Sequence, residues 1–188
     1  GAYRKLLAAI PTSTNDARHH RNRAMEMLLW DTGVRNGELV ALNAEDADPM
    51  GMRAIVKTEK SRGRRPFREV FWTAETNEQL VRWLEARRKI RAKDPNALFL
   101  CVSGPEAGAR LSQKSVADVL RRYCNKGGIP YMNPDSFRHR VGHAIIERDD
   151  SAVDVMNILG HASLASSSVY TMITDWELEE RYRKIIGA

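Results

Sequence analysis

The chain has 188 residues, of which 43% are hydrophobic and 29% charged, and its formal net charge is +6. This profile is typical of one soluble globular domain with a sizeable core, and it includes no apolar run of about 18 residues that would span a bilayer. The only two cysteines, Cys101 and Cys124, lie far apart and so indicate neither a disulfide framework nor a zinc site, while the isoelectric point near 9.5 favours a polyanionic partner.

The first half of the chain predicts two helices followed by two strands. An apolar stripe within "NDARHHRNRAMEMLLWDTG" predicts a helix that stops at Gly33, and a short helix, "RNGELVALN", follows at once. The segments "MRAIVK" and "FREVFW" are short and rich in β-branched or aromatic residues, which predicts two strands joined by a basic turn.

Helices dominate the remainder. Thr76 and Gln79 form a capping-box pattern before "NEQLVRWLEARRKIR", and Ser112 is the expected N-cap of "SQKSVADVLRRYCNKGG". "ALFLCV" is compatible with a strand or a buried turn. Further helices are expected in "DSFRHRVGHAIIERD", "SAVDVMNIL", "SSSVYTMI" and "DWELEERYRKII". The chain is therefore predicted to be a single α+β domain over residues 1–188, mostly α-helical with a small antiparallel β-sheet.

The predicted hairpin concentrates positive charge. Its turn region, "KTEKSRGRRPFR", has only one acidic residue, Glu59, among six basic ones: Lys57, Lys60, Arg62, Arg64, Arg65 and Arg68. Such a run is compatible with a solvated charged loop or with a hairpin that follows the phosphates of a nucleic acid.

Two further arginines fit phosphate chemistry. Cleaving a phosphodiester without a metal requires cations for the non-bridging oxygens, an acid for the leaving oxygen and a nucleophile. The planar fork of arginine suits the first task, and the candidates are Arg35 in "DTGVRNGELVAL" and Arg138 in "DSFRHRVGHA". Either residue alone could equally be an ordinary surface arginine.

The order of the motifs carries more information than any one of them. "TGVRNGELVAL", a lysine-bearing hairpin, "SFRHRVGHAI" and "LGHASLASSSVYT" follow one another, and His161 precedes Tyr170 by nine positions. Together these motifs resemble the tyrosine recombinase family, which includes phage integrases and Xer-type recombinases. The resemblance covers nearly the whole chain and implies the catalytic-domain fold of that family.

The resemblance also implies roles for individual residues. The expected catalytic residues are Arg35, Lys60, Arg138, His161 and Tyr170, with Glu38 supporting the site, Lys57 as the reserve for Lys60, and DNA contacts from Lys57, Arg62, Arg64, Arg65 and Arg68. Tyr170 would attack the scissile phosphate to give a 3′-phosphotyrosyl bond, a step that implies no cofactor and no metal. The expected partners are double-stranded DNA and further copies of the chain, as a tetramer on paired sites. The expected location is the cytoplasm, on DNA and not in a membrane.

One position departs from the family pattern. The family has His-x-Leu-Arg-His around its second arginine, whereas this chain has Asp135 at the first His position. An ionised carboxylate cannot donate to a phosphate, so either Asp135 lowers activity, or it orients a neighbouring Arg or Lys, or the site is supported in some other way.

Three alternatives remain open at this level. A DNA-binding module of the same fold with impaired catalysis is suggested by Asp135 and by the expectation that the family's N-terminal DNA-binding domain is absent from this chain. A helix-turn-helix regulator explains the charge but not the ordered motifs. A metal hydrolase using His139, His143 and His161 lacks both an HExxH spacing and a carboxylate cluster.

Overall fold

The computed structural model describes residues 1–12, 15–58, 66–149, 159, 183–184 and 186–187. These residues form, in chain order, α1 (Ala2–Ala9), α2 (Ala17–Thr32), α3 (Asn36–Ala41), the 3-10 turn η1 (Ala44–Asp46), β1 (Ala47–Asp48), β2 (Arg53–Lys57), β3 (Phe67–Phe71), α4 (Ala74–Arg87), α5 (Gln113–Lys126) and α6 (Pro134–Asp149). The predicted α+β class, mostly helical with a small antiparallel sheet, is confirmed.

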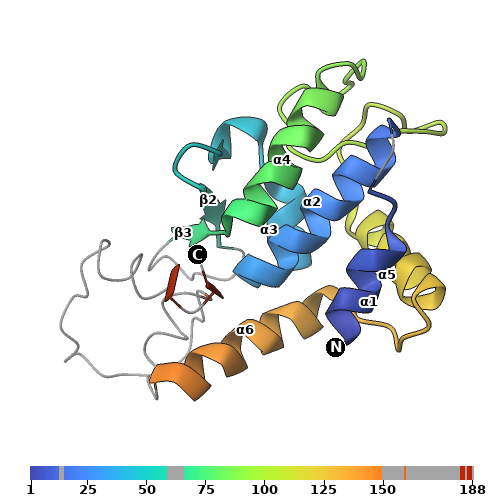
Figure 1. The fold of residues 1–188 in the computed structure, drawn as a ribbon. Helices are drawn as coiled ribbons and strands as arrows, with labels where there is room; N and C mark the ends of the chain where they lie inside the picture. The colour runs from blue at the N-terminus through green and yellow to red at the C-terminus, as the bar shows by residue number, and fades with distance from the viewer. Residues whose placement is uncertain (13–14, 59–65, 150–158, 160–182, 185, 188) are drawn as a thin grey trace.

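Helix α2 is the central element, and it packs against both α4 and α6 (Figure 1). The Asp16 side chain caps its first turn by accepting the N–H of Arg18 at 2.9 Å. At the other end Gly33 takes the left-handed conformation, with φ of 59°, and its N–H donates to the carbonyl of Leu29 at 3.0 Å. Because neighbours surround α2, it buries charged residues as well as apolar ones, among them Glu26 and Asp31.

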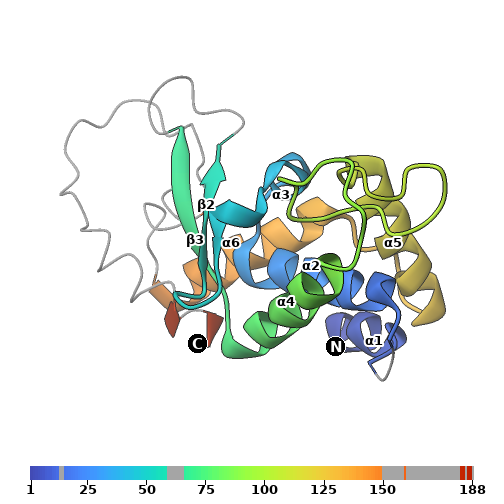
Figure 2. The same ribbon diagram turned by 90° about the horizontal axis from the view of Figure 1, so that it is seen from above.

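The sheet has the order β1-β2-β3, with antiparallel pairing throughout. Figure 2 shows it on one side of the helices, with α5 on the opposite side. Side chains alternate along β2, so that Ala54 and Val56 are buried whereas Lys57 is exposed. Val56 is paired with Arg68, which places the side chain of Arg68 on the inner face of the sheet.

The main core joins all the helices to the inner face of the sheet. Its largest fully buried members are Trp72, Trp83, Phe99, Phe137 and Leu6. A smaller apolar cluster holds Phe71, Val141, Ile145 and Leu159 together, and thereby links β3 to α6 and to Leu159.

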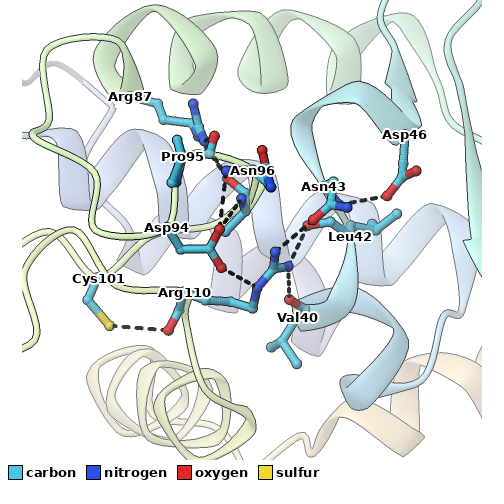
Figure 3. A network of polar contacts seen from close by, with 11 residues as sticks. Val40, Leu42, Asn43, Asp46, Arg87, Asp94, Pro95, Asn96, Cys101 and Arg110 are labelled. Carbon is cyan, nitrogen blue, oxygen red and sulfur yellow. Dashed lines mark hydrogen bonds and ion pairs between the residues drawn. The ribbon is translucent and has the colours of Figure 1, made fainter.

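A long connection between α4 and α5 fixes the C-terminal end of α3 (Figure 3). Within it, Arg110 donates through Nη1 to the carbonyls of Val40 at 2.9 Å and Leu42 at 3.1 Å. Its Nη2 donates to Asn43 Oδ1 at 2.7 Å, and its Nε donates to Asp94 Oδ2 at 2.8 Å. A cation at the last carbonyls of a helix is favourable, and here it anchors the helix whose first turn carries the candidate site.

Some expected elements differ from the observed ones. The capping box at Thr76 and Gln79 is wrong, because Thr73 caps α4 and accepts the N–H of Thr76, whose hydroxyl is bound to Asp31. Residues 97–102 contain no strand and make only isolated bridges. Helix α1 and strand β1 were not predicted, although the apolar residues of α1 recur at helical spacing. The helices expected over 151–159, 166–173 and 175–186 lie largely outside the described residues.

Candidate active site

Arg35 lies at the junction of α2 and α3, where the chain turns between two helices. It precedes the first residue of α3 and has extended backbone angles, φ −68° and ψ 153°. Its backbone N–H donates to Glu38 Oε2 at 2.9 Å and its Nη1 donates to Glu38 Oε1 at 3.2 Å. The side chain keeps 20% of its surface exposed, so that it reaches solvent from an otherwise buried junction.

Glu38 binds a second arginine, Arg68 of β3. Arg68 donates through Nη1 to Oε1 at 2.9 Å and through Nη2 to Oε2 at 2.7 Å, a two-pronged ion pair. The side chain of Glu38 is fully buried and that of Arg68 is 7% exposed. Burial raises the pKa of Glu38, but the hydrogen bonds and charges of Arg68 and Arg35 outweigh it, and the net pKa lies below the ordinary value.

Arg138 of α6 reaches the same junction from the far side. Its Nη1 donates to the carbonyl of Gly33 at 3.0 Å, and its Nη2 donates to the carbonyl of Leu159. Burial, together with the positive charges of Arg35 and Arg68, lowers the pKa of Arg138 to about 10. Arg138 therefore ties three segments together: the turn before Arg35, helix α6 and the residue two positions before His161.

Gly33 is required at this junction for two reasons. Its left-handed backbone suits glycine, and a Cβ there would lie 3.1 Å from Leu159 Cδ2 and 3.1 Å from Val141 Cβ. The "TG" that precedes Arg35 thus gives the chain both its turn and the close approach of α6.

The cluster carries excess positive charge on the described side chains. Arg35, Arg68 and Arg138 contribute three positive charges, and Glu38 is the acid that pairs with two of them. Such a half-buried surplus, in surroundings of low dielectric constant, suits an anion with several oxygens, such as a phosphodiester.

Asp135 lies in the first turn of α6, one helical turn before Arg138. An acidic residue in this position is favourable toward the helix N-terminus, where the backbone N–H groups are unpaired. Its charge also opposes the lowering of the pKa of Arg138. The N-terminal turn is closed by Asn133, whose Oδ1 accepts the N–H of Ser136 at 2.9 Å.

The structure brings together part of the predicted site. Arg35, Glu38 and Arg138 lie in one cluster, and Lys57 is exposed on the outer face of β2, opposite to the face that carries Arg68. The remaining expected residues lie outside the described part of the chain: Lys60, Arg62, Arg64, Arg65, His161 and Tyr170.

Arg68 is partnered inside the protein. The sequence analysis placed it in the predicted strand "FREVFW" and also counted it in the basic run expected to contact DNA; it lies within β3, and both its Nη atoms are bound to Glu38. Strand alternation was the signal that would have found this, because Arg68 shares its face with Val70, and Val70 lies among apolar core residues.

Two further findings bear on the expected chemistry. Among residues that the structure describes, no group of three or more His, Cys, Asp or Glu side chains is arranged to hold a metal ion. Every helix in that part of the chain is too short or too polar to cross a membrane.

Comparison with known proteins identifies the family. Residues 2–177 match the model of the phage integrase family. Tyrosine recombinase XerC of Bifidobacterium longum subsp. infantis is 30% identical over 175 residues, which cover 88% of this chain and 47% of the relative. XerC of Corynebacterium glutamicum is 29% identical over 174 residues, with 92% and 53% coverage.

Solved structures agree with this fold. The XerA recombinase superposes with a TM-score of 0.72 at 26% identity, over 97% of this chain and 62% of that one. The XerH recombinase bound to its difH substrate gives a TM-score of 0.69 at 20% identity, over 99% and 48%, and shows likeness of fold alone.

The fold is thus that of a tyrosine recombinase catalytic domain. The chain belongs to the phage integrase family. It spans about half the length of the curated XerC relatives it matches.

Proposed function

We propose that this chain is the catalytic part of a site-specific DNA recombinase, which cuts and rejoins DNA through a 3′-phosphotyrosyl intermediate. The observation that carries the proposal is the convergence of Arg35 and Arg138, where Arg138 binds the carbonyl of Gly33 across 105 positions of sequence. Two guanidinium groups at one half-buried junction, with a third held behind them, suit the charge that builds on a phosphate under attack.

The roles follow the chemistry of phosphoryl transfer. The Tyr170 hydroxyl attacks phosphorus, the bond from phosphorus to the 5′ oxygen breaks, and the products are a 3′-phosphotyrosine and a free 5′-hydroxyl. Arg35, Arg138 and His161 stabilise the negative charge, and Lys60 gives a proton to the leaving oxygen. The contact of Arg138 with Leu159 supports this assignment, since Leu159 begins the "LGH" motif that leads to Tyr170.

Double-stranded DNA is the proposed substrate, with two copies of the chain on each of two paired sites. The net charge of +6 and the exposed Lys57 of β2 support DNA as partner. The Tn1549 transposon integrase, which has a similar fold, was solved in complex with a circular intermediate DNA, and this agrees with the choice. The protein would act on DNA in the cytoplasm.

Covalent capture on a mixture of DNA sequences tests the proposal, because no single target site has to be chosen. The chain is incubated with a library of nicked duplexes that have a randomised centre, and denatured complexes are recovered and sequenced. We expect an adduct that maps to Tyr170 and is lost in Tyr170→Phe. The control is Tyr131→Phe, which changes a tyrosine that is 39% exposed and lies beneath Arg121, and which should retain the adduct. An adduct that survives Tyr170→Phe would contradict the assignment.

Asp135 separates this proposal from a binding module with impaired catalysis. If Asp135 supports Arg138, as its place one turn away suggests, Asp135→Asn and Asp135→His should both slow single-turnover cleavage. If Asp135 is instead a lost donor, Asp135→His should raise the rate on the order of 10²-fold. If the parent chain, Asp135→Asn and Asp135→His all bind DNA and none of them cleaves it, the binding module is favoured.

A further inference from the structure

Glu38 is shared unequally by two arginines. Arg68 takes one lone pair on each carboxylate oxygen through its two Nη atoms, whereas Arg35 has a single side-chain bond, from Nη1 at 3.2 Å. Within the described residues, Nε and Nη2 of Arg35 have no hydrogen-bond acceptor, and the Arg35 side chain is 20% exposed. Toward the part of the chain that the structure describes, Arg35 therefore keeps one edge of its fork unused while its position is fixed.

We infer that Arg68 is a positioning residue, which holds Glu38 so that Arg35 remains available to a phosphate; this rests on the proposed function. A fully buried carboxylate gains most from a two-pronged pair with one guanidinium. If Arg68 were absent, the nearest guanidinium would be that of Arg35, which would turn to take both oxygens. Its free edge would then be consumed by Glu38 and lost to the DNA.

The position of Arg68 argues against a direct phosphate contact. Its side chain is 7% exposed, and it lies on the inner face of the sheet opposite Val56. Its Nη1 also donates to Thr58 Oγ1 at 3.3 Å. To reach DNA, Arg68 would have to leave Glu38 buried with half its partners, which is costly.

This competition gives a double-substitution test with a distinctive sign. Arg68→Gln should slow single-turnover cleavage on the order of 10²-fold, because Arg35 is then held by Glu38. Adding Glu38→Gln should restore about tenfold of that loss, since a neutral amide releases Arg35. DNA affinity and its salt dependence should match those of the parent chain, because Arg68 touches no phosphate.

The measurements use the 188-residue chain and one nicked duplex selected by covalent capture on the unsubstituted protein. Arg53→Gln is the matched control: it removes a positive charge from the same sheet, but from an exposed side chain paired with Asp48 and Glu69, and should leave the rate unchanged. Arg68→Lys covers the case in which Arg68→Gln fails to fold. It keeps the charge with a single point of attachment and should slow cleavage about tenfold.

A readout independent of cleavage follows the Arg35 side chain by NMR. A two-pronged pair hinders rotation of a guanidinium, so the Nη protons of Arg35 should become separately resolved in Arg68→Gln and average again when Glu38→Gln is added. Unchanged Arg35 signals in Arg68→Gln would overturn the inference, whether or not the chain cleaves DNA. A lack of cleavage by the unsubstituted chain would contradict only the proposed recombinase function. Unaltered cleavage by Arg68→Gln would also overturn it. A third result would overturn it as well: Arg68→Gln binds DNA more weakly, its salt dependence has a slope lower by about one, and its effect adds to that of Glu38→Gln. These results together would identify Arg68 as a phosphate ligand.

Discussion

Two buried glutamates, one in α3 and one in α2, show how differently the same side chain is treated in this fold. Glu38 accepts hydrogen bonds from Arg35 and Arg68 on both oxygens, and its pKa lies below the ordinary value. Glu26 is 0% exposed, and within the described residues neither of its oxygens has a donor. Burial raises its pKa well above the ordinary value, and the charge of Arg23 offsets this only in part.

The difference lies in which of the two carboxyl groups is paired with cations. Arg23, whose charge acts on Glu26, makes no hydrogen bond to it: its Nη1 donates to the carbonyl of Leu7 at 2.9 Å, at the end of α1, and its Nε has no partner among the described residues. Burial thus raises the pKa of Glu26, which has no partner among the described residues, whereas the two cations that Glu38 organises lower its pKa. We therefore expect an apolar replacement of Glu26 to be tolerated by the fold and an apolar replacement of Glu38 to be costly.

The largest expected effect is that of Glu38→Met. It leaves Arg35 and Arg68 without their shared acid in a buried site, and should lower the free energy of unfolding by about 3–5 kcal/mol. Denaturant titration of the parent chain and the variant measures this. Glu38→Gln keeps an acceptor and should cost clearly less; equal losses in the two variants would argue against charge pairing as the cause.

The same substitution at Glu26 should have the opposite sign. Glu26→Met removes a buried carboxyl that has no partner among the described residues and replaces it with an apolar side chain of similar volume, so the free energy of unfolding at neutral pH should rise by about 1–3 kcal/mol. Glu26→Gln is the control, because the amide is still polar and unpartnered and should bring little gain. A loss of stability in Glu26→Met would show that the carboxyl has a partner in solution.

The two glutamates should also give opposite pH dependence. The native chain holds the Glu26 proton above the ordinary pKa of 4.5, where the unfolded chain releases it, so the contribution of Glu26 to stability falls as pH rises from 4.5 to the raised pKa. The Glu38 contribution is present above 4.5 and is lost as pH falls through its lowered pKa. Each slope is at most about 1.4 kcal/mol per pH unit. Unfolding titrations of the parent and the two Met variants from acid to neutral pH would separate them, and equal slopes of one sign would contradict the comparison.

A smaller difference in stability is expected between two threonine hydroxyl groups, one near Asp31 of α2 and one near the Glu38 cluster. Thr76 donates to the buried Asp31 at 2.6 Å, so Thr76→Val should destabilise the chain by about 1 kcal/mol. Thr58 accepts a long hydrogen bond of 3.3 Å from Nη1 of Arg68, which keeps its shorter bonds to Glu38 when Thr58 is changed, so Thr58→Val should cost about 0.5 kcal/mol or less. Thermal unfolding of both variants makes the comparison, and a larger loss at Thr58 would reverse it.

Local patterns were sufficient for much of this fold. The apolar stripe of α2, its stop at Gly33, the Ser112 cap of α5 and the β-branched residues of β2 each depend on residues close together in the sequence, and the structure has the elements that they predict. The start of α4 was wrong by a few residues, because Thr73 and Thr76 are both competent caps and Asp31 of α2 decides between them.

The sequence by itself determined the arginines and the order of the motifs, because the residue types that hold a phosphate and the turns that present them are local properties. Only the tertiary structure decided how those arginines are partnered. Arg68 stands in a basic run in the sequence, but pairing with Val56 turns it inward to Glu38, and Arg138 finds the carbonyl of Gly33 only when α6 packs on α2. Such contacts join groups far apart in the chain, and burial makes them strong because it removes the water that would otherwise compete for the same donors and acceptors.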